Sequence, residues 1–159
     1  MSDSPIEPSA PDLSFIEMDG KYEAHRRLRA SLIAPNKTAL FDALAASGIS
    51  RVTVTFDGYG DSGQIEDIAA KAGETPASLP ETTITVARAV WDEAEPQTAE
   101  AAIAAVIEDI AYQLLEQTHC GWENNAGAFG EFTFDVAART ITLEYNERFE
   151  GSEYYEHTF

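Results

Sequence analysis

The chain has 159 residues, a formal net charge of -18 and apolar residues at 44% of its positions. This length fits one domain, and the apolar fraction is high enough for a hydrophobic core. A chain so acidic repels phosphate backbones and anionic lipids, so we expect neither direct nucleic-acid binding nor binding to a membrane surface. Residues 49–159 hold 21 of the 28 acidic residues, so the acidity belongs to the last two thirds of the chain.

Cys120 is the single cysteine, which excludes an intrachain disulfide and a multi-cysteine zinc site. The first residues, MSDSPIEPSAPDLSF, have neither a basic start nor an apolar core, so they do not resemble a signal peptide. No stretch approaches the apolar length of a membrane span. These features favour a cytoplasmic protein.

Residues 1–14 are rich in Ser, Pro and Asp and are predicted to be a disordered tail, followed by a single domain over residues 15–159. Apolar spacing predicts a helix over 19–33, ended by Pro35, and a short helix over 37–47. Alternating residues predict a strand over 51–56, and a Gly-rich turn follows at 57–63. Residues 64–70 are either the returning strand of a hairpin or a short helix, and we favour the strand. A loop over 73–81 and a strand over 82–90 complete this half.

A long helix is predicted over residues 98–117, with Thr98 as its N-cap. Residues 129–135 and 139–145 alternate as the two strands of a hairpin, and the remaining C-terminal residues are acidic with interleaved aromatics. Strands joined by short turns pair in antiparallel fashion. The predicted fold is therefore α+β, a single two-layer domain with helices packed on one face of an antiparallel sheet.

Two glycine-containing segments hold the candidate binding residues. The turn at 57–63 contributes Asp57, Tyr59, Asp61 and Ser62. Asp57, Asp61 and Glu66 are weak candidates for a Mg²⁺ or Ca²⁺ site, whereas the default interpretation is a tight turn whose side chains cap backbone amides. Neither an EF-hand nor a phosphate-binding loop fits the spacing.

The second segment links the long helix to the hairpin and contributes His119, Cys120, Trp122, Glu123, Asn124 and Asn125. A Cys–His nucleophile is one interpretation, but sequence neighbours rarely form a catalytic pair, and a structural cysteine is the alternative. His25, His119 and His157 lie far apart in the sequence without metal-binding spacing. We therefore predict no catalytic residue, no metal and no cofactor.

The stretches FDGYGDSGQIEDI (56–68) and LLEQTHCGWENNAGAFGEFTFDVAARTITLEYNERF (114–149) resemble a family of small bacterial proteins of unknown function. The C-terminal EYYEHTF is similar to the end of that family, and residues 1–50 carry none of the resemblance. The resemblance implies a cytoplasmic protein from bacterial and mobile-element contexts. It brings no established activity, cofactor or catalytic residue.

The leading hypothesis is a non-catalytic protein-binding or adaptor module whose partner is another protein, one with a basic surface. One alternative is an acidic mimic of nucleic acid that occupies a DNA-binding protein. Its carboxylates would come from the hairpin (Glu131, Asp135, Glu144) and the C-terminal segment (Glu147, Glu150, Glu153, Glu156). The other alternative is a metal-dependent or Cys-based hydrolase. Arg26, Arg27 and Arg29 form a basic spot, either a solvated helix face or a docking point for an acidic partner.

Overall fold

The computed structural model describes residues 9–59, 62–120, 127–148 and 152–159. Its elements, in chain order, are α1 (Ser9–Ala46), β1 (Arg51–Tyr59), β2 (Ser62–Ala72), β3 (Thr75–Ala77), β4 (Thr83–Arg88), β5 (Gln97–Ala102), α2 (Ile103–Thr118), β6 (Ala128–Asp135), β7 (Thr140–Arg148) and β8 (Ser152–Thr158).

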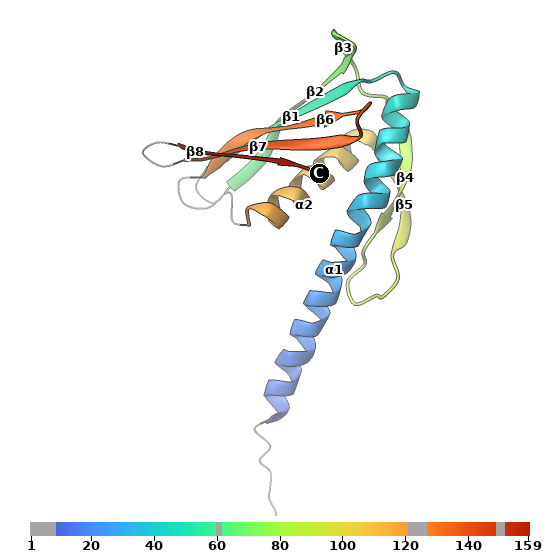
Figure 1. Ribbon diagram of the computed structural model, residues 1–159. Coiled ribbons are helices and arrows are strands. Elements are labelled where there is room, and N and C mark those ends of the chain that lie inside the picture. The colour runs from blue at the N-terminus through green and yellow to red at the C-terminus, as the bar shows by residue number, and fades with distance from the viewer. Residues whose placement is uncertain (1–8, 60–61, 121–126, 149–151) are drawn as a thin grey trace, which may run out of the picture.

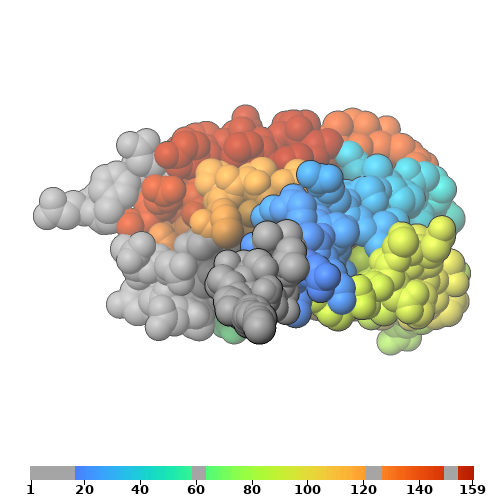
Figure 2. All heavy atoms as spheres, turned by 90° about the horizontal axis from the view of Figure 1, so that it is seen from below, coloured from blue at the N-terminus to red at the C-terminus, as the bar shows by residue number. Residues whose placement is uncertain are grey.

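Six strands form one antiparallel sheet in the order β3-β2-β1-β6-β7-β8, while β4 and β5 pair separately. Helix α2 and the second half of α1 lie against one face of the large sheet (Figure 1). Figure 2 shows α1 between the β4–β5 hairpin on one side and the large sheet with α2 on the other. The predicted α+β fold with helices on one face is confirmed.

The core of the sheet comes from the alternation that the sequence shows. Val54 of β1 pairs with Phe132 of β6, which pairs with Leu143 of β7, and all three side chains are fully buried. Phe41 of α1 packs on Phe134 of β6, with ring centroids 6.2 Å apart. The predicted strands over 51–56 and 64–70 and the predicted C-terminal hairpin are therefore confirmed.

Helix α1 contradicts the prediction that Pro35 ends a helix, because it continues from Ser9 to Ala46 with Pro35 inside it. Proline removes one helical hydrogen bond to the carbonyl four residues earlier. Ser31 and Pro35 are both exposed, so water can hydrate that carbonyl. Burial of Leu40 and Leu44 beyond the proline stabilises the continuing helix. The helix also includes residues 9–14 of the predicted tail, and residues 1–8 lie outside the described part.

The predicted start of the long helix at Thr98 is wrong. Residues 97–102 form β5, and α2 begins at Ile103 after Ala102, which makes no side-chain capping bond. The Glu100 carboxylate accepts hydrogen bonds from the hydroxyls of Thr83 and Thr85 across the β4–β5 pair. Cross-strand contacts of this kind favour the strand over the helical propensity of an Ala-rich segment.

Two further strands were not predicted. Residues 75–77, expected to be loop, form the short edge strand β3, which pairs with β2. The acidic C-terminal segment forms β8, which pairs with β7 along the opposite edge of the sheet. The Phe159 amide and carbonyl also exchange hydrogen bonds with Ile141, so the chain's last residue extends this pairing.

Candidate functional site

The flanks of the two candidate segments meet at one end of the sheet. Gly58, near the end of β1, pairs with Ala128 at the start of β6, and Asp57 pairs with Phe129. The Arg148 amide at the end of β7 donates to the Gly127 carbonyl. Segments that lie about seventy residues apart in the sequence therefore border one region of the fold.

Arg148 ties these strand ends together through its side chain. Its guanidinium lies 2.5 Å from a carboxylate oxygen of Asp57 and donates to the Gly58 carbonyl at 2.9 Å. The same group lies over the ring of Phe129, 4.8 Å from the centroid. Asp57 is thus a predicted site residue whose carboxylate is held by an arginine that the sequence analysis did not single out, because 91 positions separate the two.

The structure describes only some of the predicted binding residues. Tyr59 and Ser62 are paired with each other where β1 and β2 meet the turn. Cys120 is exposed and lines a cleft between α1 and α2. The remaining predicted residues lie outside the described ranges: Asp61, Trp122, Glu123, Asn124 and Asn125.

His119 caps the end of α2 and joins an aromatic cluster on the helix-covered face. Its ring stacks on Tyr145 with centroids 3.6 Å apart and lies 5.1 Å from Tyr155. Its Nε2 atom is 2.9 Å from Nε2 of His157 in β8. The structure thus brings together two histidines that lie 38 positions apart in the sequence. No local sequence pattern indicates this pair, because β8 was not predicted as a strand.

The histidine pair predicts loss of stability in mild acid. Burial, and then the charge of His157, lower the pKa of His119. The unfolded chain therefore binds this proton at higher pH than the folded chain, and the free energy of unfolding falls as pH drops below about 6.5. Chemical unfolding between pH 7.5 and 5.5 measures this fall. We expect His157→Gln to reduce this fall, because it removes the neighbouring charge that lowers the pKa of His119; an equal fall in wild type and His157→Gln would contradict the account.

The hydrolase alternatives gain no support from the described residues. Among them, no group of three or more His, Cys, Asp and Glu side chains is placed to hold a metal ion. Asp57 is paired with Arg148, and Glu66 is exposed. Within the same ranges, the hydrogen-bond partner of His119 is His157 rather than Cys120.

The face of the large sheet opposite the helices carries a row of carboxylates. In register across five strands lie Asp67 (β2), Thr55 (β1), Glu131 (β6), Glu144 (β7) and Glu156 (β8), which we call the acidic row. Neighbouring strands are about 4.8 Å apart, so the carboxylates of Glu131, Glu144 and Glu156 lie close together, while Thr55 separates them from Asp67. No helix of the described ranges covers this open face (Figure 1).

Burial, hydrogen bonds and like charges together raise pKa values in and beside the acidic row. Burial and a hydrogen bond with Glu144 raise the pKa of the Glu131 carboxyl group. Tyr154 donates its hydroxyl proton to Glu144 at 2.9 Å, and this bond is the main cause that raises the pKa of Tyr154 to about 12. Like charges directly opposite on neighbouring strands destabilise a sheet. The open face thus holds negative charge at a cost in stability.

Exposed aromatic rings lie beside the acidic row. Phe129 and Tyr154 are 39% and 56% exposed and belong to the next register row, with Asn146 between them. Arg148 already lies over the Phe129 ring. The open face therefore offers both ingredients that attract guanidinium and ammonium groups, carboxylates and π-faces.

Comparison with known families then places the chain. The sequence model of a family of unknown function, DUF6878, matches residues 32–159. The chain belongs to this family. The match confirms the expected membership of a family of unknown function. It begins within α1, so it also includes residues 32–50, which the sequence resemblance left out.

No curated protein and no solved structure matches this member of the family. None of the described helices is long and apolar enough to cross a membrane. The family's region contains the acidic row, the His119–His157 pair and the Asp57–Arg148 pair.

Proposed function

We propose that this protein is a protein-binding module and that the open face of its large sheet docks a partner with a basic surface. The observation that carries the proposal is the acidic row on a sheet face without a helical cover. Sheets with one uncovered face normally carry mixed polar residues there. A line of like charges, kept despite its repulsion, indicates selection for something other than stability.

The chemistry beside the acidic row supports the same partner. The Arg148 guanidinium lies between the Asp57 carboxylate and the Phe129 ring, which is the arrangement by which an arginine of a partner would be held. Tyr154 offers a second exposed ring next to Glu144 and Glu156. Tyrosine is among the residues most often found to dominate interface energetics.

Binding of a fluorescent deca-arginine peptide, measured by anisotropy, tests the proposal. We expect Glu131→Gln, Glu144→Gln and Glu156→Gln together to weaken binding about tenfold, because each exposed pair contributes about 0.2–1 kcal/mol. The matched control replaces Glu81, Glu93 and Glu95, which are exposed outside the large sheet, and removes the same total charge. Equal weakening by both triple variants would mean that net charge, not the open face, binds the peptide.

The acidic row also favours a second candidate, mimicry of nucleic acid. A line of carboxylates at the spacing of β-strands presents regularly placed negative charge, as a phosphate backbone does. In that case the basic partner is a DNA- or RNA-binding protein. Competition between the module and nucleic acid for the partner distinguishes this candidate from docking elsewhere on the partner.

A further inference from the structure

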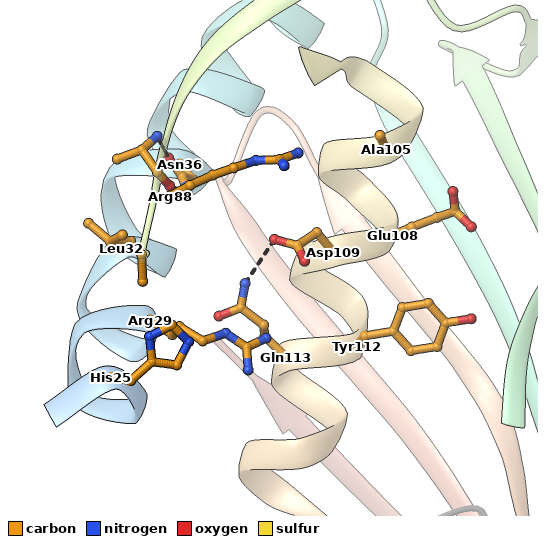
Figure 3. A pocket seen from close by; sticks show the side chains of 12 residues that line it. His25, Arg29, Leu32, Asn36, Arg88, Ala105, Glu108, Asp109, Tyr112 and Gln113 are labelled. Atoms are coloured by element: carbon orange, nitrogen blue, oxygen red, sulfur yellow. Dashed lines mark hydrogen bonds between the residues drawn. The ribbon is translucent and has the colours of Figure 1, made fainter. Parts of the chain in front are cut away.

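A cleft of about 430 Å³ lies between α1, α2 and β4. Its α1 wall carries His25 and Arg29, and Arg88 reaches into it from β4 (Figure 3). On the α2 wall, Gln113 donates to Asp109 at 2.9 Å. This volume lies within the range of sites for small molecules, about 300–1,000 Å³.

Among the described residues, the arginines of the cleft form no ion pair with a carboxylate. Five ion pairs join described side chains, and neither Arg29 nor Arg88 belongs to any of them. This is notable in a chain with 28 acidic and ten basic residues. Two carboxylates, Glu108 and Asp109, also line the cleft. Figure 3 shows Glu108 directed away from both arginines, and the Asp109 carboxylate accepts a hydrogen bond from Gln113. The space between Arg29 and Arg88 is therefore bordered by two guanidinium groups and one carboxylate.

His25 adds an unsatisfied polar atom to the same wall. Its Nδ1 is buried and has no hydrogen-bond partner among the described residues. The ring is held edge-on against Trp91, with centroids 5.4 Å apart. A buried polar atom without a partner costs about 1–3 kcal/mol.

The position of Arg88 relative to α1 is fixed by its neighbour. The Asn36 side chain accepts a hydrogen bond from the Ala87 amide and donates one to the Ala87 carbonyl, both at 2.9 Å. These two hydrogen bonds join α1 to β4 directly beside Arg88. The backbone segments that carry the two arginines are therefore joined directly.

We propose that this cleft binds a small anion whose carboxylate or phosphate oxygens engage Arg29 and Arg88. Guanidinium groups bind both kinds of oxyanion through paired N–H donors. The site is separate from the acidic open face, so it adds a ligand to the proposed protein-binding role without depending on it.

Isothermal titration of the full chain with orthophosphate, pyrophosphate and citrate, at ionic strength matched with NaCl, tests this site. We expect at least one of these anions to bind, and the preferred anion tells phosphate from carboxylate. Arg29→Gln and Arg88→Gln should each weaken that binding about tenfold or more, the effect of losing a hydrogen bond to a charged group.

The matched control is Arg27→Gln, which removes the same charge from the same helix but from a side chain that is 80% exposed and paired with Glu23. We expect it to change the affinity less than twofold. Thermal melts of all variants show whether they remain folded. Absence of binding by all three anions, or equal weakening by Arg27→Gln, would overturn the proposal.

Discussion

Replacing Gly130 by alanine is expected to lower the free energy of unfolding by about 2–3 kcal/mol, near the upper end of overpacking costs. A Cβ at this position would overlap the backbone carbonyl oxygen of Glu144 on the neighbouring strand and would lie 3.1 Å from Cζ of Phe56. The strand cannot move away without breaking the β6–β7 pairing. Urea denaturation measures the change as a shift in midpoint at constant m-value.

The absence of a side chain at Gly130 also has a positive role. Phe56 and Tyr145 pair with Gly130 from either side, and their rings come together across it, 6.3 Å apart at 27°. Gly20 is the matched control, since a Cβ there would meet nothing within 4 Å. We expect Gly20→Ala to be neutral or stabilising by up to about 1 kcal/mol. A Gly130→Ala variant as stable as Gly20→Ala would show that the sheet tolerates the side chain.

Replacing Glu144 by lysine is expected to raise stability while it abolishes binding of a basic partner. Residue 144 lies directly between Glu131 and Glu156 on the neighbouring strands. A lysine there would replace repulsion between carboxylates by attraction to them. We expect a gain of about 0.5–1.5 kcal/mol from the cross-strand pairs. Against a basic surface the same change places like charges together, so affinity should fall roughly 100-fold.

Because stability should rise while binding falls, this variant distinguishes a binding interface from a surface that only stabilises the fold. Destabilising variants lose binding simply because they unfold, whereas Glu144→Lys should melt at a higher temperature than wild type and still fail to bind. Loss of the Glu144 carboxylate also removes the partner of Tyr154, whose pKa should then fall from about 12 towards its ordinary value. Absorbance titration of the tyrosines follows that fall. A variant that is less stable, or that binds normally, would contradict this account of the open face.

The alternation of the hairpin residues was enough to predict the centre of the sheet, because Phe132, Phe134 and Ile141 are buried by the same pattern that identifies them. Element ends were less predictable. Pro35 is tolerated because the residues beyond it are buried, and Thr98 is in a strand because β4 is available to pair with it. Both outcomes depend on tertiary contacts, which override local propensity.

The candidate sites depended still more on contacts between distant residues. Glu131 and Glu144 were predicted to share an exposed face, but their continuation to Glu156 and Asp67 required the register of β8 and β2. The pairing of His119 with His157 is equally long-range, spanning 38 positions. Arg29 was noted only as part of a basic run.

Site-specific photo-crosslinking in the protein's own host cells tests the central claim most directly. A benzophenone amino acid at Thr142, next to the acidic row on the open face, is compared with one at Ala45, which is exposed on α1. We predict that Thr142 yields a crosslink to a protein with a basic surface, that Ala45 does not, and that Glu144→Lys removes the crosslink. A crosslink from Ala45 alone, or one at Thr142 that survives Glu144→Lys, would contradict the assignment of the open face as the interface.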